Sequence, residues 1–205
     1  VDRQERGMNM AHRKWLACLG AVFLLGGCAS TPAPVFYTLD NGIEQPGPQG
    51  ATPSIVITQT NLPELIDRPQ LVTRTANNQV RINEQQRWGE PLRRAIPRVL
   101  SMELGRKLDS GRIVSVPIDA QRIDADFRLS LEVQRLEVLE GRGADADIVW
   151  RLESRHGKVV LGRSVLHEAE RSVEPSALIA AQRRALAVIA AEIADQVRRW
   201  QEAAK

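Results

Sequence analysis

The sequence predicts an α+β fold in which two helices cover one face of a mixed, mostly antiparallel sheet. Several short runs alternate apolar and polar residues, the pattern of strands that bury one face. Two longer segments, residues 90–109 and 176–203, place apolar residues every three to four positions, as helices with one buried face do. One apolar sheet face and two apolar helix stripes pack as two layers. We therefore expect a single two-layer sandwich.

The beginning of the chain has the organisation of a secretory signal. A basic cluster, His12–Lys14, precedes the uncharged segment Trp15–Gly27, and small residues follow Cys28. A positive segment, a short apolar segment and small residues at a processing point define such signals. A membrane-spanning helix is the alternative. Thirteen residues at about 1.5 Å each reach only about 20 Å, which is short of the roughly 30 Å core of a bilayer.

Cys28 is the candidate lipid-attachment residue. Leu25-Gly26-Gly27-Cys28 resembles the lipobox of bacterial lipoproteins, whose cysteine thiol accepts the lipid. A buried core cysteine is the alternative, because free cysteine is often buried, but the charge cluster and the short apolar segment favour lipidation. Cys18 lies inside the signal, so the mature chain has no cysteine left for a disulfide or a metal site. By the same resemblance, Ala29 after the cysteine predicts the periplasmic face of the outer membrane.

These patterns divide the chain into three parts. Residues 1–7 are expected to be an upstream extension, because Met8 and Met10 are better-placed starts. Proline and glycine are frequent after the cysteine and predict an extended tether, interrupted by a short β-like run at residues 35–39 that could pin the start of the domain. The expected parts are a signal peptide at 1–27, a lipid anchor and proline-rich tether at 28–53, and one domain at 54–205.

Strands and helices of the domain follow in order. Ile55–Thr58 predicts a short buried strand. Gln70–Arg74 and Gln79–Asn83 flank Asn77-Asn78, and asparagine tolerates the left-handed backbone of a hairpin turn. In the helix at 90–109, Pro91 suits the first helical position, and Pro97 is expected to bend or reset the helix because it removes a backbone hydrogen bond.

The second half of the domain predicts a meander and a closing helix. Ile113–Val116 is a short strand. Apolar residues alternate from Phe127 to Val133 and then change parity at Leu136, which predicts a bulge near Gln134-Arg135. Two further strands, near 148–152 and 158–169, complete an antiparallel meander with one covered face. The last helix spans about 176–203, and Ser176 is the expected N-cap.

Composition and motifs argue against nucleic-acid binding and catalysis. The formal charge is +3, but residues 1–27 hold four Lys/Arg and two Asp/Glu, which leaves 24 basic and 23 acidic residues with no basic stripe. A carboxylate pair such as Asp145 and Asp147 could be proposed as acid and base, but the two residues lie two apart on a strand edge, where we expect them to be solvated. His156 and His167 lie in a turn and near a strand end. We therefore expect no enzyme, cofactor or metal.

Two segments carry a family resemblance. Residues 62–74, LPELIDRPQLVTR, and residues 87–92, RWGEPL, resemble the PqiC family, also called YmbA-like proteins. The order of features agrees along nearly the whole mature chain, from the lipobox through the Phe-Tyr-Thr-Leu run at 36–39 to the Ala- and Arg-rich helix at 177–186. Pro97 is the one departure.

The resemblance implies a role in transport across the envelope. PqiC-like proteins are auxiliary lipoproteins of MCE-type ABC transport systems, which are thought to move lipids or other hydrophobic molecules between the two membranes. The implied partners are a PqiB-like periplasmic MCE-domain protein, its inner-membrane component, and outer-membrane lipids bound through the acyl anchor. The resemblance also leaves a ring-shaped homo-oligomer open.

The residues of these two segments have two interpretations. They are Leu62, Pro63, Asp67, Arg68, Pro69 and Gln70, together with Trp88, Glu90 and Pro91. We favour a structural role, because a loop entering a hairpin needs a fixed turn and Pro69 keeps the preceding residue extended. Contact with a partner protein is the alternative.

Two functions remain open at this stage. The first is a non-catalytic outer-membrane lipoprotein that docks the MCE component of a PqiABC-like system. The alternative is an independent periplasmic lipoprotein that binds a lipid or assists outer-membrane assembly. The alternative predicts an enclosed apolar cavity within the sandwich, whereas the two helix stripes look just wide enough to cover the sheet.

Overall fold

A computed structural model describes residues 32–40, 42, 50–75, 78–115 and 123–203. All of the described helices and strands belong to one unit, Pro34–Lys205. In chain order they are β1 (Val35–Tyr37), β2 (Ile55–Asn61), β3 (Gln70–Arg74), β4 (Val80–Trp88), α2 (Leu92–Leu108), β5 (Ile113–Ser115), β6 (Phe127–Leu139), β7 (Gly143–Ser154), β8 (Val159–Ala169) and α3 (Pro175–Glu202).

In this part of the chain the strands form one mixed sheet of eight strands packed against two helices, which confirms the predicted α+β fold. Strands β6, β7 and β8 form the expected antiparallel meander. The β3–β4 hairpin is also antiparallel, and Asn78 in its turn has a φ of 61°. The pairings of β1 with β4, β2 with β5, and β6 with both β2 and β3 are parallel.

One edge of β6 is divided between two strands. Strand β7 pairs along the whole other edge of β6, from Phe127 to Leu139. On the edge opposite β7, β2 pairs with Phe127–Glu132 of β6, and β3 pairs only with Val138 and Leu139. The register shift between Val133 and Arg135, which is the predicted bulge, lies between these two pairings. The connection from β2 to β3 therefore lies beside the part of β6 where its partner changes from β2 to β3.

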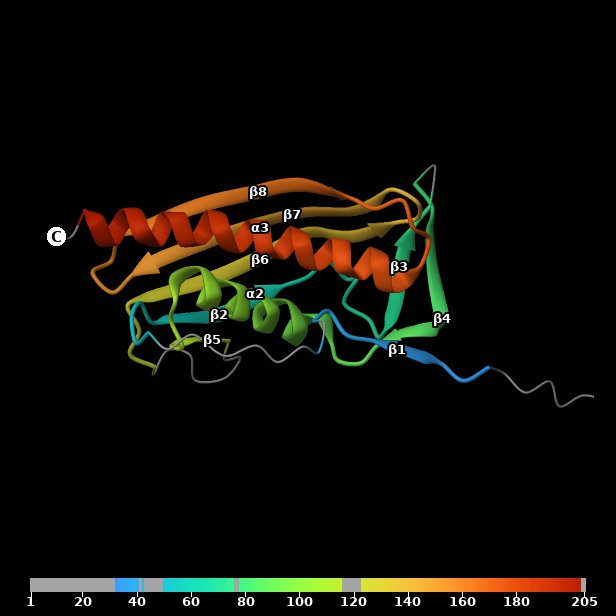
Figure 1. Cartoon of the computed structure of the whole chain (residues 1–205), viewed down its shortest axis with the longest axis horizontal. Coiled ribbons are helices and arrows are strands. Elements are labelled where there is room, and N and C mark those ends of the chain that lie inside the picture. Colours follow the sequence, from blue (N-terminus) through green and yellow to red (C-terminus); the bar gives the residue numbers. More distant parts are fainter. Residues whose placement is uncertain (1–31, 41, 43–49, 76–77, 116–122, 204–205) are drawn as a thin grey trace, which may run out of the picture. The chain divides into compact units, whose positions relative to one another are not determined.

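Both helices pack on the same face of the sheet and on each other (Figure 1). Helix α3 lies along β6, β7 and β8, and α2 lies over β2 and β5. Buried residues of α3 recur at helical spacing, as the sequence predicts, and α2 contributes a second stripe to the same core. The core residues of the two helices include Ile96, Val99, Leu100 and Leu104 from α2, and Leu186, Ile189, Ile193 and Val197 from α3.

Two predicted helix starts are wrong in detail, and Pro97 does not interrupt α2. Pro91 is the N-cap of α2 and not its first residue, and α3 begins at Pro175 after Glu174, so Ser176 is not a cap. Helix α2 continues through Pro97 from Leu92 to Leu108. A proline removes one backbone hydrogen bond, and the burial of Ile96 and Leu100 on either side of it stabilises the helix through that point.

The folded unit begins before residue 54. Strand β1 pairs with β4, and Leu39 is only 1% exposed within the main core. The short run at 35–39 therefore attaches the end of the expected tether to the domain. The described helices include none that combines the length and the hydrophobicity needed to cross a bilayer.

Candidate functional site

The segments that carry the sequence motifs meet at one end of the sheet. Strand β1 pairs with the end of β4, with Tyr37 opposite Trp88. The backbone N–H of Trp88 donates to the carbonyl of Pro69 at 2.7 Å, and the N–H of Gly89 donates to the carbonyl of Tyr37 at 2.8 Å. Residues 36–39, 62–74 and 87–92 are thus joined by main-chain hydrogen bonds, although they are far apart in sequence.

The connection between β2 and β3 is a compact turn anchored by apolar residues. Ile66 is 4% exposed in the core, and Leu62 and Leu65 pack against the same core. The N–H groups of Ile66 and Asp67 both donate to the carbonyl of Pro63 at 3.1 Å. The packing of its apolar side chains on the core and the hydrogen bonds within its turn hold this loop between β2 and β3.

Asp67 ties this loop to the first turn of α2. Its carboxylate forms an ion pair with the Arg93 guanidinium. Arg93 also donates from Nη1 to the backbone carbonyl of Thr60 at 3.4 Å. Arg68 turns back on its own loop and donates to the carbonyl of Glu64 at 3.4 Å. The pair of Asp67 and Arg93 therefore joins β2, the loop and α2.

Arg98 forms a second ionic link, one turn further along α2. It pairs with Glu90, which precedes the helix, and with Asp40, which follows β1, at 2.5 Å. The hydrogen bond to Glu90 is the main reason that the pKa of Arg98 is raised. Burial acts to raise the pKa of Asp40, but the Arg98 guanidinium and the N–H of Gly42 outweigh it and lower that pKa. The charged forms of Arg98 and Asp40 are therefore favoured.

The remaining motif residues have local contacts. Trp88 is 6% exposed and belongs to the core. The Gln70 side-chain amide donates to both carboxylate oxygens of Glu84 at 3.1 Å across the hairpin. Pro69 and Pro91 are exposed. These contacts account for structural roles of the motif, and its role in partner contact stays a prediction. Cys28 lies outside the described residues.

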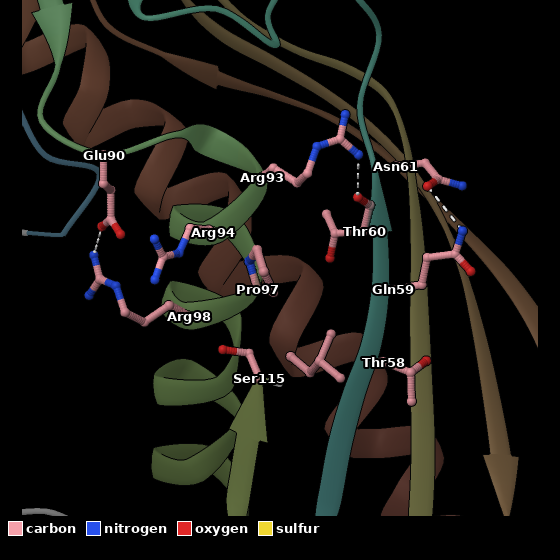
Figure 2. A pocket seen from close by; sticks show the side chains of 11 residues that line it. Thr58, Gln59, Thr60, Asn61, Glu90, Arg93, Arg94, Pro97, Arg98 and Ser115 are labelled. Carbon is pink, nitrogen blue, oxygen red and sulfur yellow. Dashed lines mark hydrogen bonds and ion pairs between the residues drawn. The ribbon is translucent and has the colours of Figure 1, made fainter. Parts of the chain in front are cut away.

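A groove opens between α2 and β2, next to the motif residues (Figure 2). Its volume is about 680 Å³. Three arginines of α2, Arg93, Arg94 and Arg98, line it together with Glu90 and the polar residues of β2. Sequence reasoning missed these arginines. The sequence contains a signal for them. Helix α2 has Arg93 and Arg94 and no acidic residue in its first turn, although the partial positive charge at a helix N-terminus makes cations unfavourable there.

The carboxylates considered for catalysis are engaged in ion pairs on the face of the sheet that the helices leave open. Asp147 binds Arg163 through two contacts of 2.9 and 2.8 Å, and this hydrogen bonding lowers the pKa of Asp147. Asp145 contacts His167 at 2.8 Å and Arg135 at 3.6 Å. Because its pKa is lowered, Asp147 is ionised at neutral pH and is a poor general acid. Among the described residues, no cluster of His, Cys, Asp and Glu could hold a metal ion.

A comparison with known protein families identifies the family of this chain. The family model described as the ABC-type transport auxiliary lipoprotein component matches residues 37–194. The chain belongs to this family. The PqiC and YmbA proteins are members, so the resemblance found in the sequence is confirmed. Membership identifies the chain as an auxiliary lipoprotein component of an ABC-type transport system.

Solved structures share the fold at low sequence identity. A crystal structure of an uncharacterized protein matches with a TM-score of 0.65 and 16% identity, covering 81% of this chain and 99% of that one. The structure of protein XCC0632 from Xanthomonas campestris, of family DUF330, matches with a TM-score of 0.57 and 17% identity, covering 84% and 98%. No curated protein matches the chain significantly.

Proposed function

We propose that this protein is a non-catalytic lipoprotein of the outer membrane that docks the periplasmic MCE component of a PqiABC-like transport system. The observation that carries the proposal is the family match over residues 37–194, preceded in the sequence by the lipobox-like Leu25–Cys28. Acyl chains on Cys28 would fasten the domain to the periplasmic face of the membrane. The proposed cargo is a lipid or another hydrophobic molecule.

The charge of the groove favours this role over that of an independent lipid-binding lipoprotein. Such a protein would need an apolar cavity for acyl chains, because burying charged groups against hydrocarbon is unfavourable. The groove beside the motif includes Ile57 and Pro97 in its lining, but three arginines and Glu90 line it as well. A ring-shaped homo-oligomer remains a prediction of the family resemblance.

Lipid attachment is tested by metabolic labelling and fractionation. Labelled palmitate should enter the wild-type protein, and Cys28→Ser should remove the label and release the protein from the outer membrane. Cys18→Ser is the matched control, because Cys18 lies inside the expected signal peptide, and it should leave both results unchanged. A wild-type protein without label would overturn the proposed location.

Docking is tested by co-purification from native envelopes. The tagged, full-length protein is isolated from detergent-solubilised membranes, and its partners are identified by mass spectrometry. An MCE-domain protein should be enriched over a sample from the Cys28→Ser strain. Repeated absence of any MCE protein from the wild-type sample would contradict the docking role.

Partner contact by the motif surface is tested separately with a photo-crosslinking residue. Glu64 and Pro91 are exposed positions within or beside the motifs, and Val165 on the open face of the sheet is 68% exposed. If the motif surface contacts the MCE protein, crosslinks should form from positions 64 and 91 and not from position 165. Crosslinks only from position 165 would assign docking to the open face.

A further inference from the structure

Strand β1 presents apolar side chains to solvent shortly after the expected lipid anchor. Phe36 is 61% exposed and Val35 is 53% exposed, although both belong to a strand of the sheet. Tyr37 packs against the core, and Leu39 is buried in it. Because successive side chains of a strand point to opposite sides, Phe36 points away from the core.

The strand is fixed on one side and open on the other. Val35–Tyr37 pair with Gln86–Trp88 of β4, and the N–H of Gly89 donates to the carbonyl of Tyr37 at 2.8 Å. Among the described strands, β1 pairs only with β4 and forms the border of the sheet (Figure 1). These hydrogen bonds fix the position of Phe36, so a partner that binds it does not have to order the strand first.

The length of chain before β1 limits its distance from the membrane. Only seven peptide steps separate Cys28 from Val35, and an extended chain spans at most about 3.6 Å per residue. If Cys28 is acylated, as proposed above, β1 lies within about 25 Å of the bilayer surface. A short link gives a second contact an effective concentration in the range of about a millimolar, so a weak affinity of β1 for the bilayer is sufficient.

The charges of this stretch do not oppose contact with lipid. No Asp, Glu, Lys or Arg occurs from Cys28 to Leu39. The first charged residue is Asp40, and its carboxylate pairs with Arg98 at 2.5 Å. Moving an unpaired charge out of water is costly. The stretch can therefore approach a bilayer without that cost.

We propose that Phe36, with Val35 beside it, inserts into the interfacial layer of the membrane that holds the acyl anchor and so orients the domain on that membrane. The contact is shallow, because the outer edge of β1 has no strand partner in the described part of the chain and unpaired backbone groups are unfavourable in hydrocarbon. Arg87, the register partner of Phe36 in β4, then lies at the level of the headgroups. The contact is separate from any transported cargo, and it rests on the proposed acylation of Cys28.

Photo-crosslinking in vesicles tests the contact. The protein is expressed from its full-length gene with p-benzoylphenylalanine at position 36 or, as the control, at position 161, because Leu161 on β8 is 70% exposed. The purified acylated protein is reconstituted into vesicles of phosphatidylethanolamine and phosphatidylglycerol and irradiated. Mass spectrometry should find a phospholipid adduct at position 36 and none at position 161. Absence of a lipid adduct at position 36, including capture of a second copy in its place, or equal lipid adducts at both positions, would overturn the proposal.

A second measurement removes the apolar side chain. A dye on Val188→Cys, an exposed position of α3, reports the rotation of the domain by time-resolved anisotropy. Phe36→Ser should lower the ratio of membrane-held to freely rotating domain about tenfold, because part of the free energy of burying a Phe side chain is lost. Leu161→Ser is the matched control and should leave the ratio unchanged. An unchanged ratio in Phe36→Ser, or an equal loss in both variants, would contradict the contact, and circular dichroism checks that each variant is folded.

The mass of the protein before irradiation separates this inference from the anchor on which it rests. A protein without acyl chains on Cys28 contradicts the proposed lipid attachment, and the contact of Phe36 fails with it. An acylated protein that gives no lipid adduct at position 36 contradicts the contact alone and leaves the anchor in place.

Discussion

Asp126 links the starts of two parallel strands through Ser54. Its carboxylate accepts hydrogen bonds from the N–H and the hydroxyl of Ser54, at 2.9 and 2.7 Å. Burial acts to raise the pKa of Asp126, but these hydrogen bonds and the charges of Arg155 and Arg112 outweigh it, so the pKa lies below its ordinary value of 3.8. The folded state therefore favours the ionised carboxylate.

We expect Asp126→Asn to lower the free energy of unfolding by about 1 kcal/mol at pH 7, since the carboxylate is only partly buried. A pKa that is lower in the folded state contributes stability above the unfolded value, and this contribution is lost as pH falls through the folded value. The difference between wild type and variant should therefore shrink below about pH 4.

Urea unfolding at pH 7, 5 and 3 measures this difference. Asp124→Asn is the control, because the Asp124 side chain is 85% exposed and also pairs with Arg155. It should change stability by less than about 0.5 kcal/mol. A difference for Asp126→Asn that grows on acidification would contradict the assignment.

Gly162 leaves space for the Trp150 ring. A Cβ atom on Gly162 would lie 2.1 Å from Cζ2 of Trp150. The ring is nearly buried, and its Nε1 donates to Ser164 Oγ at 3.1 Å. We expect Gly162→Ala to displace the ring and lower the free energy of unfolding by about 1–3 kcal/mol.

Chemical unfolding followed by tryptophan fluorescence checks the Gly162 prediction. Leu161→Ala changes the neighbouring residue of β8, which is 70% exposed, and it should have an effect of less than about 0.5 kcal/mol. Equal stability of Gly162→Ala and wild type would show that the ring moves freely.

At the scale of elements, the bulge in β6 keeps the two halves of the strand on the same core. Val133 before it and Leu136 after it are both buried, at 1% exposure each. The parity change in the sequence predicted this bulge, because apolar residues on both sides of it must face the helices. A strand without the extra residue would place one half of its apolar residues on the open face.

Deletion of Gln134 should therefore destabilise the protein by more than about 3 kcal/mol or prevent folding. The control is Gln134→Ala, which keeps the residue count and changes an exposed side chain. Circular dichroism and urea unfolding of the two variants provide the comparison. If the deletion variant were as stable as Gln134→Ala, the bulge would not set the register.

At the scale of the whole molecule, we predict that residues 34–205 fold without the preceding residues. Contacts divide the chain after Ala33, and all described strands and helices follow that point. A protein starting at Pro34 should unfold in one urea transition with the same midpoint as the full chain, whereas one starting at Ser54 should be less stable because it lacks β1 and the buried Leu39. Equal stability of the two truncated proteins would show that β1 is dispensable.

Much of the fold could be predicted because its signals are local. The hairpin around Asn78 and the long stripe of α3 each depend on residues close in sequence. Helix α2 starts at Leu92, one position after the predicted Pro91, and the N-cap of α3 is Glu174 in place of the predicted Ser176. Both differences arise because capping depends on backbone geometry that residue type only biases. The groove was not predicted, since its lining residues come from α2, β2 and β5, which are brought together only when α2 packs on the sheet.

The sequence by itself determined the meander, its bulge, the two amphipathic helices and the family, because periodicity and motifs are properties of neighbouring residues. Only the tertiary structure decided that β2 and β3 share one edge of β6, that Asp67 meets Arg93, and that Asp40 and Glu90 meet on Arg98. Those pairings join residues distant in the chain. Their geometry follows from how the layers pack and leaves no periodic trace in the sequence.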